Sequence, residues 1–173
     1  YRKDKLERII FQQCGPVRHE IKTIDGDELQ KRAIIRETSF RVPDSVGMRP
    51  PYHVMAHLLT KDAKRNDQIV FDIVVALENR RFPLVLSDRK EHLATIEAAI
   101  RDLISKEPGL SAEIYRFDGK VSSKQRAIHL NEISNARLSG ARVCLLSTSS
   151  LIGEGFDLPE LDTLVITMPL SFK

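Results

Sequence analysis

The stretch STSSLIGEGFDLPELDTLVITMP, residues 147–169, decides the fold, because its tight turn leads from one apolar strand into another. The turn carries two glycines, Gly153 and Gly155, followed by Asp157 and then a proline, which prevents a long helix from starting there. Residues 161–168, LDTLVITM, have the apolar character of a second strand. Residue types alone leave three readings of this turn open: a plain connection, a phosphate-binding loop or an acidic catalytic loop.

Apolar strands and amphipathic helices alternate along most of the chain. The predicted strands are residues 32–43, 82–87, 112–119, 141–148 and 161–168. The predicted helices are residues 52–81, 88–105 and 122–138, the last opened by a capping box of Ser122 and Gln125. This alternation predicts an α/β fold with a mostly parallel sheet covered on both faces. Ligands of such sheets bind beyond the carboxyl ends of the strands. We therefore expect one shared edge for the loops after Leu86, Phe117, Leu146 and Met168.

The composition is that of an ordinary globular protein. Of the 173 residues, 42% are hydrophobic and 29% are charged, and the net charge of +3 permits a nucleic-acid partner without demanding one. The two cysteines, Cys14 and Cys144, lie far apart in sequence and indicate a reduced, cytoplasmic setting. No apolar run approaches the roughly 20 residues of a membrane span, so we expect no membrane partner.

Three further patterns give weak signals. His53 and His57 have the spacing of two zinc ligands on a helix, but Val54 stands where a zinc protease has its glutamate, so we predict no metal site. Both cysteines are interpreted as buried apolar residues. The Gly-Glu-Gly run at 153–155 lacks the third glycine of a dinucleotide fingerprint.

A cluster of hydroxyls, residues 147–150, follows the strand at 141–148. One hydroxyl could cap the next turn, or the hydroxyls and free backbone N–H groups could bind a phosphate. The two interpretations are compatible, and both stay open. Asp157, after the glycines, could accept a hydrogen bond from a sugar hydroxyl.

Three blocks of the sequence together resemble the second RecA-like lobe of superfamily-two helicases. PLVLSDRKEHL (83–93) resembles motif IV, RFDGKVSSKQRAIHLNEI (116–133) the next conserved block, and residues 147–169 resemble motif V. Within this superfamily, the sequences of the three motifs are most similar to those of DEAD/DEAH-type proteins akin to type III restriction subunits. The resemblance implies a three-layer α/β/α, RecA-like helicase C-terminal domain over 32–173, incomplete at its end. Residues 1–31 are then the tail of the first lobe or a linker.

The resemblance also implies roles for particular residues. Thr148 matches the threonine that holds nucleic-acid phosphate, and Gly155 and Asp157 match residues that meet the nucleotide, with Gly153 beside them. The residues expected to bind nucleic acid are Ser87, Arg89, Gly119, Lys120 and Thr148.

The implied function is the second motor lobe of an ATP-dependent helicase or translocase, an ATP hydrolase in its complete form. The chain has no GxxxxGK[ST] loop and no acidic Mg²⁺-binding box, and the arginine-rich motif VI would follow Lys173. Both ends read as cut. We therefore expect a piece with no catalytic residue of its own and no tightly bound cofactor. ATP and Mg²⁺ would belong to the intact protein. The expected partners are the first lobe of the same chain and a nucleic acid, with DNA preferred over RNA.

Two other classes of protein compete with this reading. Residues 149–162 also resemble the donor-sugar loop of two-lobe retaining glycosyltransferases, with Glu154 and Asp162 near the spacing of their paired acids. A helix follows that loop in those enzymes, whereas residues 161–168 here predict a strand. The third hypothesis is a non-catalytic nucleic-acid-binding module, which ATP binding by the full-length protein would exclude.

Overall fold

The structure is a computed structural model in which residues 7–15, 32–47, 50–119, 121–151 and 158–169 are described. It divides into two compact units, Tyr1–Arg36 and Glu37–Lys173. The described part of the first unit contains one helix, α1 (Glu7–Cys14). The domain boundary predicted after residue 31 stays a prediction.

The second unit is built on a parallel sheet. Its strands are β1 (Pro83–Leu86), β2 (Ala112–Phe117), β3 (Arg142–Ser147) and β4 (Thr163–Ile166). They are arranged β2-β3-β1-β4, and each neighbouring pair is parallel. The α/β fold predicted from the sequence is confirmed. Four of the five predicted strands are present; β2 and β4 form the edges of the described sheet, and β1 and β3 lie between them.

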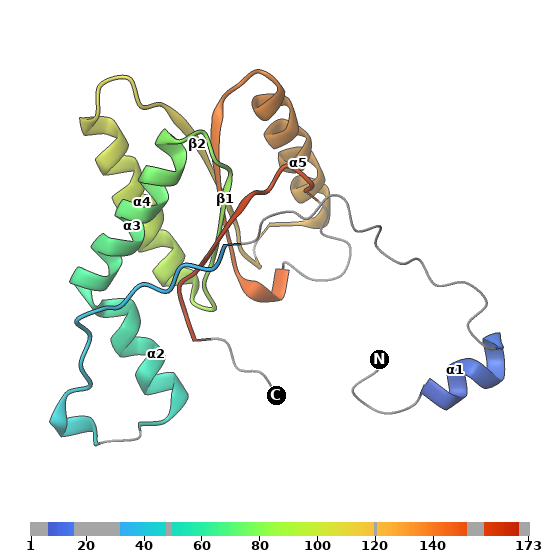
Figure 1. Ribbon diagram of the computed structural model, residues 1–173, viewed down its shortest axis with the longest axis horizontal. Coiled ribbons are helices and arrows are strands. Elements are labelled where there is room, and N and C mark those ends of the chain that lie inside the picture. The colour runs from blue at the N-terminus through green and yellow to red at the C-terminus, as the bar shows by residue number, and fades with distance from the viewer. Residues whose placement is uncertain (1–6, 16–31, 48–49, 120, 152–157, 170–173) are drawn as a thin grey trace. The chain divides into compact units, whose positions relative to one another are not determined.

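Helices cover both faces of this sheet, which gives three layers (Figure 1). The first face carries α3 (Ala63–Glu78) and α4 (Lys90–Lys106), and the second carries α5 (Ser123–Leu138). Alternate strand residues point to opposite faces, so each strand contributes to both cores. The core under α3 and α4 contains Val74, Leu77, Val85, Leu93, Ile96, Cys144 and Leu146. The core under α5 contains Phe82, Leu84, Phe117, Ile133, Val143 and Leu145.

The face under α5 is incompletely covered at β4. Leu164 pairs in register with Leu84, and Ile166 pairs with Leu86, so both β4 side chains lie on the α5 face. They remain 56% and 47% exposed, respectively. α5 therefore covers the inner strands and leaves the apolar side chains of the edge strand accessible.

The single helix predicted over residues 52–81 is wrong, because two helices occupy this segment. α2 (Tyr52–Lys61) ends at Asp62, which has extended backbone angles (φ −71°, ψ 105°), and α3 begins at the next residue. The Asp62 carboxylate accepts a hydrogen bond from Arg65 N at 2.7 Å and so caps α3. The helix breaks here because this cap supplies a partner for a backbone N–H that a continuous helix would have bonded internally.

The strand predicted over residues 32–43 is also wrong. This segment has no ladder partner among the described strands, and a short 3₁₀ helix, η1 (Asp44–Val46), follows it. Ile34 and Ile35 are 60% and 92% exposed, so the alternation of apolar residues has no buried face to pack on. Farther along, Phe40 packs against a small cluster of buried residues formed by Ala56, Leu59 and Met168.

Helix and strand ends shift by one or two residues elsewhere. α4 begins at Lys90, two residues after the predicted start, and Arg89 is its N-cap. The capping box predicted for α5 is present, with the Ser122 hydroxyl accepting from Gln125 N and the Gln125 side chain accepting from Ser122 N. Within the described ranges, the helices are too short or too polar to cross a membrane.

Candidate functional site

The carboxyl ends of the strands meet at one edge of the sheet, as predicted. We use the term carboxyl edge for the described loop residues 87–90, 118–119, 121–122, 148–151 and 167–169. Backbone hydrogen bonds tie this edge together: Ser87 N to Ser147 O at 3.2 Å, Thr148 N to Phe117 O at 3.4 Å, and Thr167 N to Leu86 O at 3.0 Å. The loops after β1, β2 and β3 are therefore adjacent, and residues from distant parts of the sequence converge there.

Ser87, a predicted phosphate ligand, faces inward and belongs to a chain of hydrogen bonds. Ser87 is 1% exposed, and its Oγ lies 3.0 Å from Nδ1 of His92. His92 Nε2 lies 3.0 Å from Asn66 Oδ1, and the Asn66 amide donates to Thr60 O at 2.9 Å. The Ser87 oxygen also accepts from Arg89 N at 3.3 Å. This chain connects the loop after β1 to α2 and α3.

The chain of donors has one consistent direction. Because the Asn66 nitrogen donates to Thr60 O, its oxygen is the acceptor, and His92 Nε2 must carry the hydrogen. Nδ1 of His92 is then an acceptor, and the Ser87 hydroxyl donates to it. The Ser87 hydroxyl hydrogen is thus committed inside the protein, while its oxygen holds the backbone N–H of Arg89.

Burial keeps His92 neutral. Desolvation, assisted by the positive charge of Arg65, lowers the pKa of His92 to about 4. Arg65 extends the network, because its guanidinium donates to Thr167 O at the end of β4. Burial lowers the pKa of Arg65, and Asp62 partly offsets that effect. A neutral His92 is the form that the donor direction above requires.

The N-terminus of α4 is open at the carboxyl edge. Its N-cap, Arg89, makes no side-chain capping bond, and the first backbone bond into the helix is Leu93 N to Arg89 O at 3.1 Å. The N–H groups of the first turn have no partner inside a helix, and the helix dipole adds partial positive charge there. In α5, by contrast, the Ser122 hydroxyl of the capping box accepts from Gln125 N. The N-cap of α4 makes no such side-chain bond, so its first turn leaves one more backbone donor available at this edge.

Lys90, which the motifs do not single out, lies beside Gly119. A methyl group placed on Gly119 would come within 3.2 Å of Lys90 Nζ, so the ammonium group lies against the bare backbone of the loop after β2. Arg89, Lys90 and Gly119 are all exposed. Lys90 is the first residue of α4, directly after Arg89, so its side chain lies at the same edge.

Thr148 lies beside this group but is less accessible. It is 6% exposed, and its hydroxyl shares a hydrogen bond of 3.3 Å with the hydroxyl of Ser150. Thr148 O accepts from Leu151 N at 3.0 Å, which closes the 3₁₀ turn η2 (Ser149–Leu151). The structure thus brings Ser87, Arg89, Gly119 and Thr148 to one edge. The other predicted site residues, Lys120, Gly153, Gly155 and Asp157, lie outside the described residues.

Asp88 joins two further segments to the loop after β1. Its Oδ2 accepts from the Tyr52 hydroxyl at 3.3 Å, and its Oδ1 accepts from the hydroxyl of Ser149. Burial and the Asp88 carboxylate raise the pKa of Tyr52, so its phenol stays a donor at neutral pH. The start of α2, the start of α4 and the loop after β3 are therefore held together at one carboxylate.

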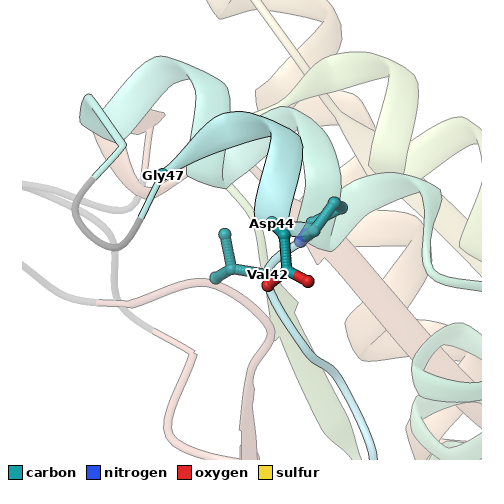
Figure 2. Close-up of a pocket in the computed structure, with 4 residues that line it drawn as sticks. Val42, Asp44 and Gly47 are labelled. Carbon is teal, nitrogen blue, oxygen red and sulfur yellow. The ribbon is translucent and has the colours of Figure 1, made fainter.

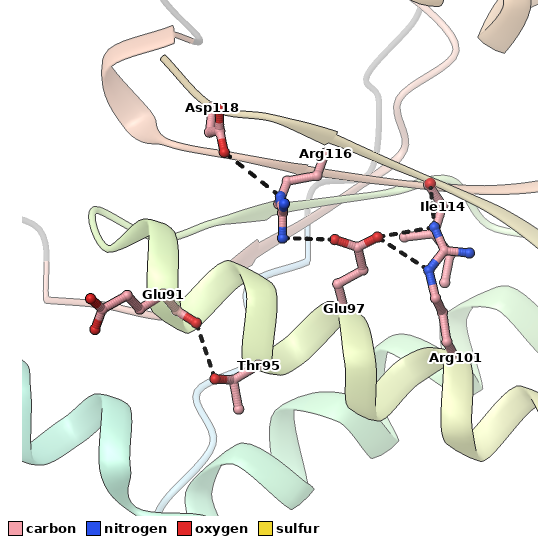
Figure 3. Close-up of polar contacts among 7 residues, drawn as sticks. All are labelled: Glu91, Thr95, Glu97, Arg101, Ile114, Arg116 and Asp118. Atoms are coloured by element: carbon pink, nitrogen blue, oxygen red, sulfur yellow. Dashed lines mark hydrogen bonds and ion pairs between the residues drawn. The ribbon is translucent and has the colours of Figure 1, made fainter. Parts of the chain in front are cut away.

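A second ionic network lies between α4 and β2 (Figure 3). Glu97 accepts from Arg101 and from Arg116, each at 3.0 Å, and Arg116 Nε lies 3.8 Å from Asp118 Oδ2. Arg101 also donates to Ile114 O at 3.0 Å. These two arginines are engaged with carboxylates, so they contribute less free positive charge than Arg89 and Lys90.

The histidine pair of α2 and the buried cysteine of β3 are placed as follows. In the parts of the chain described, no group of three or more metal-ligating side chains is present, and His53 and His57 are exposed on α2. Burial, followed by the charge of Glu97, raises the pKa of the Cys144 thiol to about 12. Cys144 is fully buried, so it packs as an apolar residue and is not a nucleophile.

Asp162, considered above as one of a pair of sugar-binding acids, lies at the opposite edge of the sheet. Its Oδ1 accepts from Phe82 N at 3.0 Å, just before β1 begins. Its partner in that hypothesis, Glu154, is outside the described residues. The loop is followed by β4 and not by a helix, and this order of elements favours the helicase fold over the glycosyltransferase fold.

A pocket of about 370 Å³ adjoins η1 (Figure 2). None of its lining residues belongs to the carboxyl edge. The pocket is lined by Val42, Pro43, Asp44 and Gly47. Gly47 has φ +82° and donates to Asp44 O at 3.2 Å, which closes the turn. Among these lining residues the one ionisable group is a carboxylate, so the pocket does not suit a phosphate.

Comparison with solved structures shows that the chain has a helicase-like, RecA-type fold. The crystal structure of T4 UvsW matches 69% of this chain with a TM-score of 0.55 and 16% sequence identity. The match covers 22% of the T4 UvsW chain. No family model and no curated protein matches the sequence. At this identity the likeness shows the fold, and the function has to be argued from the site.

Proposed function

We propose that this chain is the second motor lobe of an ATP-dependent nucleic-acid helicase or translocase. The observation that carries the proposal is the open N-terminus of α4, placed at the carboxyl edge with Arg89 and Lys90 beside it and Gly119 and Thr148 opposite. Free N–H donors, a helix dipole and two cations favour a phosphate at this point.

The proposed ligand is the phosphate backbone of a strand. A motor that moves along nucleic acid must ignore base sequence, and backbone contacts carry no sequence information. Arg89 and Lys90 supply charge, the first turn of α4 supplies N–H donors, and Gly119 lets a phosphate approach the backbone. We include Lys120 and Thr148 in the same surface. Ser87 acts through its position, because its oxygen holds Arg89 N and its hydrogen is committed to His92.

The nucleotide half of the proposal rests on the family resemblance. Gly153 and Gly155 would let the turn approach ATP, and Asp157 would accept hydrogen bonds from the ribose. A first lobe would supply the phosphate loop and the acids that hold Mg²⁺. We expect no Mg²⁺-dependent ATP turnover by residues 1–173 alone, measured as phosphate release from purified chain. In the full-length protein, Asp157→Ala should reduce ATP use and leave nucleotide-free DNA affinity unchanged.

The finer assignments are also proposals. DNA is preferred over RNA, and the subfamily akin to type III restriction subunits is preferred over other helicases, because of the resemblance of the three motifs. A cytoplasmic location is proposed from the two cysteines, which lie far apart in sequence.

The test is a salt titration of binding to single-stranded oligo-dT. Arg89→Ala and Lys90→Ala should each weaken binding and reduce the salt slope by about 0.7 for each phosphate that is no longer neutralised. Lys106→Ala is the matched control, because Lys90 and Lys106 are the first and last residues of α4, about 24 Å apart along the helix axis. The same charge is removed in each case. Equal losses in all three variants would mean that net charge alone, and not this edge, binds the strand.

A further inference from the structure

Tyr52 places an aromatic ring at the carboxyl edge. It is the first residue of α2 and is 48% exposed. Its hydroxyl donates to Asp88 at 3.3 Å, and the next residue along that loop is Arg89. The ring is therefore a near neighbour of the proposed phosphate site, although Tyr52 and Asp88 are 36 positions apart in the sequence.

The ring is held in place before any ligand binds. Pro51, the N-cap of α2, accepts backbone bonds from Val54 N at 3.0 Å and Met55 N at 3.1 Å, which fixes the start of the helix. The hydroxyl end is tied to Asp88, which also accepts from Ser149. An aromatic side chain fixed at both ends loses little conformational freedom on binding.

Two other exposed apolar side chains of this unit, Phe71 and Ile128, lack this setting. Phe71 is 60% exposed in the middle of α3, and Ile128 is 47% exposed on α5. Both lie within their helices and not at the helix ends that border the carboxyl edge. Tyr52 differs because a hydrogen bond connects it to the loop that carries Arg89.

We propose that the Tyr52 ring is a stacking platform for a base of single-stranded nucleic acid whose phosphates bind at the N-terminus of α4. The inference rests on the proposed function and extends it from the backbone to the bases. Every base has an aromatic face, so stacking adds affinity without sequence preference. The base must be unpaired for its face to reach the ring, so the platform selects single strands over duplex.

The experiment compares two strands of equal length, oligo-dT and an abasic strand that has the same phosphates and no bases. Wild-type chain should bind oligo-dT more tightly. Tyr52→Leu should lose about fivefold or more in affinity for oligo-dT and keep its affinity for the abasic strand. Tyr52→Phe, which keeps the ring and loses the bond to Asp88, should stay within about twofold of wild type. Phe71→Leu is the control for removing an exposed ring elsewhere.

The outcomes separate the two proposals. If wild type binds neither strand, the proposed function fails. If it binds both strands equally, or if Tyr52→Leu weakens both equally, the stacking inference is overturned and the backbone site stands. A second measurement needs no variant: a strand carrying 5-iododeoxyuridine should crosslink wild-type chain at Tyr52, as read by peptide mass spectrometry. Crosslinks confined to other segments would also overturn the inference.

Discussion

His92 is buried between Ser87 and Asn66 in its neutral form, and protonating it would break the donor direction of that chain. Its hydrogen bonds fix the position of Ser87, and Ser87 in turn holds Arg89 N. A residue that touches no ligand thereby orients the loop that we propose binds phosphate.

This arrangement makes stability depend on pH. The pKa of His92 is about 4 in the folded chain and 6.5 when unfolded, so the unfolded state binds more protons between these values. Stability from this group is fully present above pH 6.5 and is lost as the pH falls towards 4. The free energy of unfolding should therefore fall by up to about 1.4 kcal/mol for each unit that the pH falls in this range. Urea unfolding at several pH values between 7 and 4.5 measures it.

The control for that measurement is another histidine. His92→Gln should lower stability at pH 7 and flatten the pH dependence, since the titrating group is gone. His57→Gln makes the same substitution at an exposed histidine of α2 and is the matched control. An unchanged slope in His92→Gln would assign the acid sensitivity to other groups.

Single residues show where prediction from motifs stops. The motifs predicted that Arg89, Gly119 and Thr148 lie at the carboxyl edge. This placement was predictable because each residue follows the end of a strand, and the carboxyl ends of parallel strands lie at one edge. They could not show that the Ser87 hydroxyl points inward, because its partners His92 and Asn66 come from two different helices. Lys90 was missed for the opposite reason: one exposed lysine in a helix resembles any other until a neighbouring loop is placed against it.

Among the elements, α2 and α3 are separate helices because of one carboxylate. Asp62 caps α3 by accepting from Arg65 N, and this places Arg65 and Asn66 in the first turn of α3, where they meet Thr167 and His92. A continuous helix would turn these side chains in other directions. The break therefore supports the carboxyl edge.

Asp62→Ala should destabilise the chain by about 1 kcal/mol, the usual effect of losing an N-cap. Asp67→Ala, which removes an exposed carboxylate from the same helix outside the cap, should change stability by less than about 0.5 kcal/mol. Urea unfolding followed by circular dichroism measures both. Equal destabilisation by the two variants would argue against a capping role.

Elements with a buried face were predictable, and those without one were not. The periodicity of α4 and α5 and the apolar strands β1 to β4 follow from packing against one sheet, and the capping box of α5 is local. The extended segment before η1 has strand-like alternation but no partner strand in the described sheet, and sequence alone does not show whether a partner exists. The break at Asp62 was hidden because apolar spacing continues through it.

On the scale of the whole molecule, Cys144 reports on global unfolding. It lies in the central strand β3 and is fully buried, and burial raises the pKa of its thiol to about 12. In a Cys14→Ser variant, Cys144 is the single thiol of the chain. Iodoacetamide should then label it in urea along the same transition that circular dichroism follows. Rapid labelling without urea would show that the sheet opens locally.

If anions bind at the open N-terminus of α4, the melting temperature of the chain should depend on which anion the buffer contains. An ion that binds only the folded state shifts unfolding by RT ln(1 + [L]/Kd), so sulfate or inorganic phosphate should raise the melting temperature as its concentration rises. These ions also stabilise proteins by exclusion from the surface, which Arg89→Ala leaves intact. The melting temperature of wild type should therefore rise more with sulfate than that of Arg89→Ala does. In chloride at the same ionic strength, the two proteins should show equal rises. A melting temperature for this chain has meaning only together with the anion in which it was recorded.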